Sequence, residues 1–352
     1  MSSQKPFVAI VILSWNGRNY LKEYLPSVLK TEYSNYGVYV ADNDSTDGTT
    51  EWLPKAFPEV KLIQTGYNAG FAEGYNIALK KIEADYYVLL NQDVAVDSRW
   101  LDTLVQKAES DNKIAACQPK ILAYKKQSHF EYAGAAGGFI DRWGYPFCRG
   151  RIFDYNEADI GQYNSETEIA WGSGACLFIR ANIYHELGGL DKDFFAHMEE
   201  IDLCWRVKNA GYRLYCCPDS VVYHLGGGSL NYGNPRKTFL NFRNNLRMIA
   251  KNAPKQNWKS TLVIRLFLDQ LSAFNYLISG HLGDFKAVWK AHYSFLSELR
   301  KWIQRRQEIW QMLSEQGNKK PNKAGFYKKS IVFQYFAMKK KKFSDLQKDD
   351  FY

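Results

Sequence analysis

The fold is decided by three runs, which read Val11-Ile-Leu-Ser-Trp-Asn-Gly17, Val40-Ala-Asp-Asn-Asp-Ser-Thr-Asp-Gly48 and Tyr86-Tyr-Val-Leu-Leu-Asn-Gln-Asp93. Each begins with apolar, β-branched or aromatic residues and ends in polar ones. This pattern is typical of buried parallel strands that deliver ligand-binding loops at their carboxyl ends. A fourth stretch, Phe194-Phe-Ala-His-Met-Glu-Glu-Ile-Asp202, gathers carboxylates just before an apolar-periodic helix. A crevice that collects such carboxylates is suited to a metal, a nucleotide or both.

Strand and helix signals alternate through the first part of the chain, which predicts βαβ units and a parallel sheet. The expected strands are Phe7–Leu13, Val38–Ala41, Val60–Gln64 and Tyr86–Leu90, and the expected helices are Arg18–Leu29, Thr49–Ala56 and Phe71–Ile82. Between residues 121 and 168 the pattern degrades, which predicts long loops over one face of the sheet. Regular elements are expected again at Ile169–Trp171, Ala175–Ile179, Glu200–Asn209, Tyr212–Cys216 and Val221–His224.

After Pro235 the sequence changes to long helical patterns without strands. We therefore expect two domains, at residues 1–235 and 236–352. Residues 236–352 hold 24 Lys+Arg and 8 Asp+Glu, a net charge of +16. Residues 1–235 hold 22 Lys+Arg and 29 Asp+Glu, a net charge of −7, so the whole chain of 352 residues carries +9. A basic second part, which includes the cluster Lys339–Lys342, predicts contact with a polyanion or an anionic membrane surface.

No segment of the sequence predicts export or membrane insertion. The apolar run Phe7–Leu13 is too short for a signal peptide or a membrane span. The apolar stretch Thr261–Ser279 contains Arg265 and Asp269, and this polar load argues against a spanning helix. The six cysteines form no C-x-x-C pair, so a reducing compartment is the simpler expectation.

A dinucleotide-binding site is excluded by the first turn. That site requires G-x-G-x-x-G directly after the first strand, and the chain has Ser14-Trp-Asn-Gly17 there. The glycines of Asn68-Ala-Gly-Phe-Ala-Glu-Gly-Tyr-Asn76 follow the third strand instead. They fit either a helix N-terminus close to a phosphate or a simple tight turn.

Three polar residues at strand ends are candidate ligands of a nucleotide or a metal. Asp42 could accept hydrogen bonds from a base imide or a ribose, or it could belong to the turn before the next helix. Asp93 lies where a strand would present it to a divalent cation such as Mg²⁺ or Mn²⁺, although an isolated acidic loop residue is usually solvated. His224 precedes Leu225-Gly-Gly-Gly-Ser229 and is either a second metal ligand near a diphosphate or a packed residue.

Glu199, Glu200 and Asp202 lie within four positions. On a helix Glu199 and Asp202 share a face, and Asp202 can pair with Arg206 four residues later. Glu200 points elsewhere, and neighbouring negative charges would raise its pKa toward that of a useful general base.

The order and content of these segments resemble the family 2 glycosyltransferases, and most of all rhamnosyltransferase-like bacterial enzymes of cell-surface polysaccharide assembly. The resemblance covers about residues 6–250 and rests on S-W-N-G, A-D-N-x-S-x-D-G-T, N-A-G-F-A-x-G-Y-N, a D-x-D-like site, W-G-S-G-A, F-F-x-x-x-E-[DE]-x-D-L-x-x-R and H-x-x-G-G-S. It implies a GT-A fold, which is α/β and Rossmann-like, with a mostly parallel sheet and flanking helices, here followed by an α-helical C-terminal extension.

The resemblance also implies roles for individual residues. The implied nucleotide and donor ligands are Ser14, Asn16, Asp42, Asn68, Gly70, Asn76, Asn91 and Gln92. The sugar or acceptor site would be lined by Trp171, Gly172, Ser173 and Gly174, with the indole facing a pyranose. Asp93 and His224 would hold Mg²⁺ or Mn²⁺. Glu200 would be the catalytic base, supported by Glu199 and Asp202.

Two positions depart from the family pattern. Asn91 stands where aspartate is common at the first D-x-D position, which removes one charge from the metal site. Glu200 stands where aspartate is frequent, and the spacing leaves open whether Glu199 or Glu200 is the base.

These observations predict an inverting, metal-dependent glycosyltransferase of cell-surface polysaccharide synthesis. It would move a sugar, with rhamnose as one candidate, from a dTDP- or UDP-sugar to a saccharide or polyprenyl-linked acceptor. The basic rear would hold it at the cytoplasmic face of the cell membrane. One alternative is a catalytically weak nucleotide-sugar-binding scaffold at the membrane surface, which Asn91 makes conceivable. Another is that the basic rear is a solvated helical face that packs on the first domain; it resembles no nucleic-acid-binding motif, and no nucleic acid partner is expected.

Overall fold

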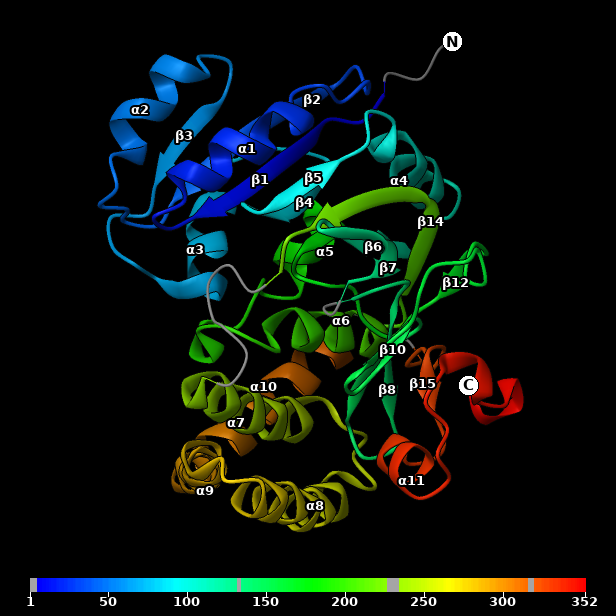
Figure 1. Cartoon of the computed structure of the whole chain (residues 1–352). Coiled ribbons are helices and arrows are strands. Elements are labelled where there is room, and N and C mark those ends of the chain that lie inside the picture. The colour runs from blue at the N-terminus through cyan, green and yellow to red at the C-terminus, as the bar shows by residue number, and fades with distance from the viewer. Residues whose placement is uncertain (1–4, 132–133, 227–233, 316–319) are drawn as a thin grey trace.

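A large mixed sheet with helices on its faces forms the upper part of the molecule, and helices gather below it (Figure 1). The computed structural model describes residues 5–131, 134–226, 234–315 and 320–352. The large sheet has the strand order β12-β14-β6-β13-β4-β1-β2-β3, with β5 paired to β14 and β7 paired to β6. Its strands are β1 Val8–Ser14, β2 Tyr36–Asp42, β3 Lys61–Gln64, β4 Tyr86–Asn91, β5 Val94–Val96, β6 Ile114–Ala123, β7 Lys126–Phe130, β12 Thr167–Glu168, β13 Cys176–Arg180 and β14 Arg213–His224.

The first half of this sheet confirms the βαβ prediction. Strands β4, β1, β2 and β3 are parallel neighbours. The apolar residues of the inner strands β4, β1 and β2 are mostly buried on both sides, as parallel strands require. The helices between them are α1 Arg18–Val28, α2 Thr49–Ala56, α3 Gly70–Leu79 and, after β5, α4 Trp100–Glu109.

The second half of the sheet is mixed and adds antiparallel pairs to the parallel ones. Strand β13 runs antiparallel to both β4 and β6, while β14 runs parallel to β6. The two strands expected at Tyr212–Cys216 and Val221–His224 are one strand, β14, with a register shift between Cys217 and Val221. The expected strand Ile169–Trp171 is reduced to an isolated bridge between Gly138 and Trp171.

The region expected to be loops, residues 121–168, contains a second sheet. Its order is β11-β10-β9-β8-β15. The last strand, β15 (Phe326–Tyr327), comes from the C-terminal region and pairs with β8, so the expectation of a rear without strands is also wrong. The other strands are β8 Gly138–Asp141, β9 Pro146–Cys148, β10 Arg151–Ile152 and β11 Tyr155–Asn156.

The remaining helices hold the acidic segment and form the lower layer. The segment ends in α6 (Glu199–Asn209), as predicted, and is preceded by α5 (Ala181–Glu186) and a short 3-10 turn, Lys192–Phe194. The lower layer consists of α7 Pro235–Asn252, α8 Trp258–Ile278, α9 Leu282–Ser297 and α10 Leu299–Glu315, and α11 Ile331–Phe336 follows β15. 3-10 turns at Phe343–Asp345 and Lys348–Asp350 end the chain.

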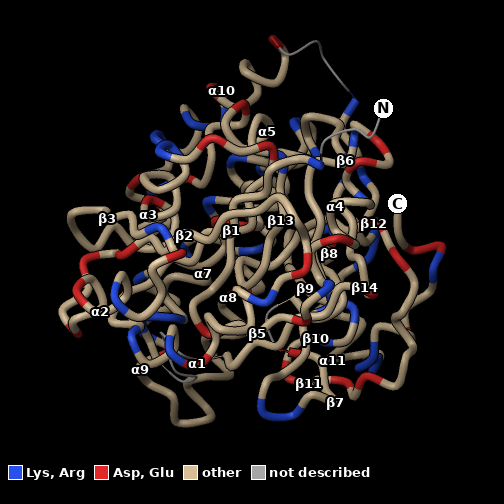
Figure 2. Tube along the Cα trace, turned by 90° about the horizontal axis from the view of Figure 1, so that it is seen from above, with Lys and Arg blue, Asp and Glu red and all other residues tan. Residues whose placement is uncertain are grey.

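Charge and cysteine placement add two facts. Lys and Arg are interspersed with Asp and Glu around the rim of the molecule rather than confined to one element (Figure 2). All six cysteines are free and buried.

Among the described residues, α8 is the one helix long and apolar enough to cross a membrane by length and composition.

Candidate active site

The ends of β4, β1 and β2 form a continuous edge. Ser14 is in register with Asp42 across β1 and β2, and Leu13 is in register with Asn91 across β1 and β4. The Ser14 hydroxyl donates to Gln92 Oε1 at 2.9 Å, and the Trp15 amide donates to the same oxygen at 3.3 Å. The predicted donor residues Ser14, Asp42, Asn91 and Gln92 therefore lie side by side because the parallel register brings their strand ends together.

Asp42 has a free oxygen directed away from the turn it holds. The side chain is 2% exposed, and its Oδ2 accepts from the Ser45 amide at 3.2 Å. Its Oδ1 has no hydrogen-bond partner. A buried carboxylate oxygen without a partner is costly unless a ligand satisfies it. Asp42 is thus placed to accept a hydrogen bond from a bound group.

Asn16 and Asn68 hold the loops that border this edge. Asn16 has a positive φ of 48° and its Oδ1 accepts from the Thr46 amide at 2.8 Å. Asn68 Oδ1 accepts from the Gly70 amide at 3.1 Å, at the start of α3.

Gly70 and Asn76 are committed to contacts within the protein. A Cβ at Gly70, where φ is 71°, would lie 2.5 Å from the Phe195 ring. Asn76 donates to the Leu190 carbonyl at 2.7 Å and accepts from the Tyr184 hydroxyl at 2.6 Å. These contacts give both residues a packing role in place of the direct ligand role expected of them.

The two predicted metal ligands are brought together, with a third residue that sequence reasoning missed. His224 Nε2 lies 3.2 Å from Asp93 Oδ1, and its Nδ1 lies 3.4 Å from Glu131 Oε2. All three side chains are buried. Burial alone would lower the pKa of His224, but the contacts with Asp93 and Glu131 outweigh it and raise the pKa to about 10. Asn91 Nδ2 approaches the same Nε2 at 3.5 Å.

The donor set of this cluster fits a divalent cation. Two neighbouring ligands that are each about 2.1 Å from an ion lie about 3 Å apart, close to the observed Asp93–His224 spacing. An oxygen and an imidazole nitrogen suit Mg²⁺ or Mn²⁺. Glu131 lies on the side of the opposite ring nitrogen, at 3.4 Å, where it would orient His224 instead of ligating. Among the residues that the structure describes, no group of three or more His, Cys, Asp or Glu could hold an ion, so substrate oxygens and water would complete the shell. The glycines at 227–228 lie outside the described residues.

The loop Trp171–Gly174 connects this edge to the acidic helix. The Asn91 amide donates to the Ala175 carbonyl at 3.0 Å, directly after the loop. A Cβ at Gly174 would lie 3.7 Å from Glu200 Cγ, and one at Gly172 would lie 2.8 Å from Leu177. The Ser173 amide donates to Gln118 Oε1 at 2.9 Å.

Trp171 does not offer its ring to a sugar. The side chain is 6% exposed, and its Nε1 donates to the Phe139 carbonyl at 2.9 Å. A Cβ at Gly138 would lie 2.2 Å from the indole. The expected pyranose platform is therefore corrected to a core residue that supports the loop.

Glu199 and Glu200 begin α6 and each keep one oxygen without a hydrogen-bond partner. Both Oε2 atoms are buried and unpartnered. Burial raises the pKa of Glu200 to about 7, against backbone hydrogen bonds that lower it. Burial raises the pKa of Glu199 well above its usual range, and the charges of Glu200 and Asp202 add to the effect. The two carboxyls differ in their surroundings, because like charges add to the effect of burial at Glu199, whereas backbone hydrogen bonds oppose it at Glu200.

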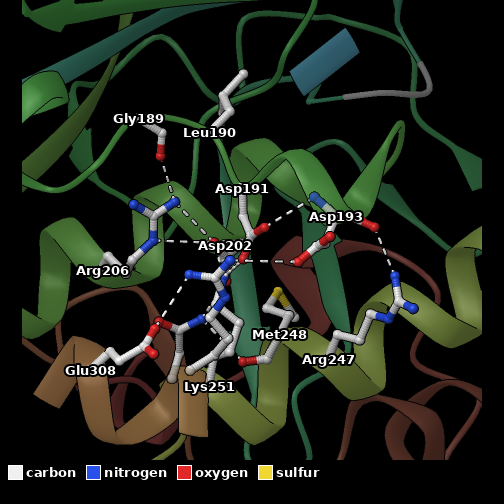
Figure 3. A network of polar contacts seen from close by, with 12 residues as sticks. Gly189, Leu190, Asp191, Asp193, Asp202, Arg206, Arg247, Met248, Lys251 and Glu308 are labelled. Carbon is white, nitrogen blue, oxygen red and sulfur yellow. Dashed lines mark hydrogen bonds and ion pairs between the residues drawn. The ribbon is translucent and has the colours of Figure 1, made fainter. Parts of the chain in front are cut away.

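Asp202 is held in an ion network rather than directed at the site (Figure 3). It is fully buried and accepts from Arg206 at 2.9 Å, from Lys251 at 2.9 Å and from Asn252 at 2.7 Å. Lys251 also pairs with Asp191 at 2.6 Å. The predicted Asp202–Arg206 pair is present, and the expected supporting catalytic role of Asp202 is corrected to fastening α6 to α7.

The segment before α6 has a strained backbone. Phe195, His197 and Met198 have φ angles of 65°, 70° and 75°. The Asn244 side chain on α7 donates to the carbonyls of Phe194, Ala196 and His197 at 3.0, 2.9 and 2.8 Å. Left-handed non-glycine residues persist only where surrounding contacts impose them, and they cluster at functional sites. Asn244 and His197 carry no sequence signal that would have identified this arrangement.

Burial lowers the pKa of His197 to about 4, and the nearby Lys237 charge adds to this effect. Its Nε2 is buried without a hydrogen-bond partner. A neutral imidazole therefore lies two residues before the acidic pair.

Solved structures share this architecture. One is the mannosyltransferase PcManGT from Pyrobaculum calidifontis in complex with GDP-Man and Mn²⁺. The match covers 89% of this chain and 88% of that one, with a TM-score of 0.53 and 15% identity. The chain also matches GalNAc-T7 with UDP, GalNAc and Mn²⁺, over 71% of this chain and 48% of that one, with a TM-score of 0.54 and 17% identity. These similarities confirm the predicted α/β GT-A fold with a helical C-terminal extension.

Sequence comparison defines the family. Residues 9–181 match the family described as Glycosyl transferase family 2. The chain is 26% identical over 231 residues to the N-acetylglucosaminyl-diphospho-decaprenol L-rhamnosyltransferase of Mycobacterium tuberculosis (strain CDC 1551 / Oshkosh), covering 61% of this chain and 75% of that one. It is 24% identical over 226 residues to Rhamnosyltransferase WbbL of Escherichia coli (strain K12), covering 62% and 83%. Over residues 9–181 the chain therefore matches the family 2 glycosyltransferases, and it is similar to rhamnosyltransferases among them.

Proposed function

We propose that the protein is an inverting glycosyltransferase that moves a sugar, with rhamnose as one candidate, from a nucleoside-diphosphate sugar to a saccharide or polyprenyl-linked acceptor. The observation that carries the proposal is the carboxylate of Glu200. The residue is half-buried at the start of α6, its Oε2 is buried without a hydrogen-bond partner, and its side chain lies against Gly174. These features support a base placed beside a substrate, because a structural carboxylate would have its oxygens satisfied.

The proton balance of the reaction fits this carboxylate. The acceptor oxygen attacks the anomeric carbon as its bond to the diphosphate breaks, and the acceptor proton passes to Glu200. A base works best when its pKa is near the operating pH, and burial raises the pKa of Glu200 to about 7. Burial and the charges of Glu200 and Asp202 raise the pKa of Glu199 well above its usual range, which disfavours a second negative charge beside Glu200.

The donor would lie along the edge formed by β2, β1 and β4. The free Oδ1 of Asp42 suits the imide of uracil or thymine, or a ribose hydroxyl, so dTDP- and UDP-sugars are the donors we propose. Asp93 and His224 would hold Mg²⁺ or Mn²⁺, which when bound neutralises the departing diphosphate. Glu131 would keep His224 oriented for this task.

The names of two relatives suggest the class of acceptor. The mycobacterial relative is named for a decaprenol-linked diphosphate sugar, and the E. coli relative is named a rhamnosyltransferase. A lipid-linked acceptor would require the protein to work at the cytoplasmic face of the cell membrane, as the basic C-terminal region also suggests.

The test compares Glu200→Gln with Glu199→Gln in donor binding and sugar transfer. Glu200→Gln should bind the nucleoside diphosphate normally by calorimetry while transfer falls by about two to four orders of magnitude. Glu199→Gln mimics the protonated state and should keep most of the transfer. If Glu199→Gln alone abolishes transfer, the base is Glu199. If neither variant changes the rate, the acidic pair has no catalytic role.

The scaffold alternative makes a different prediction. A protein that only binds the donor would show no release of nucleoside diphosphate from any donor in a panel with Mn²⁺, even with acceptor present. Inversion is checked independently by the anomeric configuration of the product in nuclear magnetic resonance spectra. Retention of configuration would contradict direct displacement.

A further inference from the structure

Helix α8 buries charged side chains and exposes large apolar ones. Its two charged inner residues, Arg265 and Asp269, are buried, at 2% and 0% exposure. A surface helix of a soluble protein normally turns its apolar stripe inward and its charges outward. The apolar side chains Val263, Phe267, Leu271, Phe274 and Ile278 recur at spacings of three and four residues and are exposed by 67%, 65%, 55%, 60% and 71%.

The buried charges explain why the helix lies in this orientation. Arg265 pairs with Asp269 at 3.2 Å, and its guanidinium lies 3.5 Å from the centre of the Tyr145 ring. Asp269 also accepts from the Tyr145 hydroxyl at 3.1 Å and lies 3.3 Å from His292 Nε2 on α9. The polar side of α8 is therefore bonded to the β8–β9 turn and to α9. A helix crossing a bilayer would lose these partners, whereas one lying along the surface keeps them.

The exposed apolar surface continues onto neighbouring helices. On α9 it includes Trp289, Tyr293 and Leu296, which are 55%, 77% and 49% exposed. Near α11 it includes Phe333, Phe336 and Met338, at 56%, 56% and 54%. We call the exposed side chains of α8 and α9 the apolar face.

Helices α8, α9 and α11 lie together at the bottom of the molecule (Figure 1). The turn at residues 141–145 links two of them, because Asp141 accepts from the Ile331 amide of α11 at 2.9 Å while the Trp143 carbonyl accepts from Arg265 of α8 at 3.3 Å. The apolar residues of α11 are therefore placed to extend the apolar face.

The exposed charges of the segment that carries the apolar face, residues 254–297, have one sign. Between residues 254 and 297 the only acidic residues are Asp269 and Asp284, and both are buried. The lysines of the same segment are exposed, as are three of the four lysines of the cluster Lys339–Lys342; they are Lys255, Lys259, Lys286, Lys290, Lys339, Lys341 and Lys342. An open hollow of about 430 Å³ is lined by two of these lysines and two aromatic rings, from Phe285, Lys286, Trp289 and Lys290.

We infer that the apolar face of α8 and α9 inserts into the interfacial region of an anionic phospholipid bilayer, with the helix axes along the membrane plane. Exposed apolar residues, aromatic rings at the border and exposed lysines in a segment, residues 254–297, whose carboxylates are both buried suit that partner. A second copy of the chain is a poorer fit, since it would place lysines against lysines. The inference refines the proposed membrane-side function by naming the contact surface, and it differs from a purely electrostatic role of the lysine cluster at 339–342.

The experiment uses the full chain and vesicles of phosphatidylcholine alone or mixed with phosphatidylglycerol. The native protein should float with the mixed vesicles and keep part of its binding at high salt, because apolar insertion is not screened. Each inserted large apolar side chain contributes roughly tenfold to partitioning, so the variant F267S/L271S/F274S should bind at least about 100-fold more weakly. These side chains are already exposed, so the fold should be unaffected, which thermal melting checks.

A matched control removes an equally exposed side chain elsewhere. Ile160 is 84% exposed, and Ile160→Ser should leave vesicle binding unchanged. The charge reversals K286E and K290E should weaken binding to the mixed vesicles only. Nucleoside diphosphate binding by the triple variant should match the native protein, so a failure here is separable from a failure of the proposed transfer.

Three outcomes overturn the inference. The first is a native protein that ignores anionic vesicles at low salt. The second is a triple variant that binds them like the native protein. The third is a triple variant that changes from dimer to monomer in sedimentation, which would make the apolar face a contact between copies.

Discussion

Replacing Asp202 with asparagine should lower the free energy of unfolding by about 3 to 5 kcal/mol while leaving the chemistry of the site in place. The side chain is fully buried, and both of its oxygens accept from charged or amide donors on α6 and α7. Asparagine keeps the shape of the side chain and removes its charge. Its amide NH₂ group would also lie against N–H donors of Arg206, Lys251 or Asn252. The penalty comes from the cations left behind, Arg206 and Lys251, which are 4% and 1% exposed in their side chains.

The remaining contacts set the lower end of this range. Lys251 keeps its pair with Asp191 at 2.6 Å, and Arg206 keeps the carbonyls of Leu187 and Gly189. The loss should therefore be close to about 3 kcal/mol rather than that of a fully abandoned charge pair.

Urea unfolding followed by circular dichroism measures the change. Glu308→Gln is the matched control, because the exposed Arg305–Glu308 pair contributes at most about 1 kcal/mol. Below the transition, folded Asp202→Asn should bind nucleoside diphosphate and transfer sugar at a rate much nearer to native than that of Glu200→Gln. If the free energy of unfolding changes by less than about 1 kcal/mol and the transfer rate falls as much as in Glu200→Gln, Asp202 takes part in the reaction.

Further predictions concern titration and metal. Since Glu200 must lose its proton to act, kcat should rise with pH through about 7, and Glu200→Gln should remove this limb. The raised carboxyl pKa also means that the contribution of Glu200 to stability is fully present below about 4.5 and lost as pH rises through about 7, which unfolding at several pH values checks against the Gln variant. Asp93→Asn should abolish Mn²⁺-dependent binding of nucleoside diphosphate in calorimetry, and equal binding with and without Mn²⁺ in the native protein would contradict the metal site. Glu131→Gln should weaken Mn²⁺ affinity about 10- to 100-fold, and unchanged affinity would remove its orienting role.

The first half of the fold was predictable because local signals and tertiary structure agree there. Strands β1, β2 and β4 are apolar runs buried on both faces, and polar residues follow each run directly. Parallel register then brings Ser14, Asp42 and Asn91 to one edge without further information.

The second half was not predictable from local pattern. Strands β10, β11 and β12 are two residues long, which is too short for an alternation of apolar and polar residues to be detected. Strand β15 is stabilised by β8, far away in sequence, so its residues carry no strand signal of their own. Asn76 and Trp171 resembled ligands because the motif that contains them is recognisable, whereas their side chains support neighbouring loops.

The C-terminal helices are more than an appendage to the catalytic half. Asn244 on α7 donates to three carbonyls of the segment before α6, and Lys251 and Asn252 on the same helix hold Asp202 within α6. The acidic pair at the start of α6 is thus fixed from both sides by one helix. The predicted boundary at residue 235 separates two charge compositions, but the groups that set the position of Glu200 come from both sides of it. The lower layer of helices, which is proposed to contact the bilayer, therefore also holds α6 in place through α7. In the proposed function, the membrane contact and the base Glu200 would thus be fixed relative to each other.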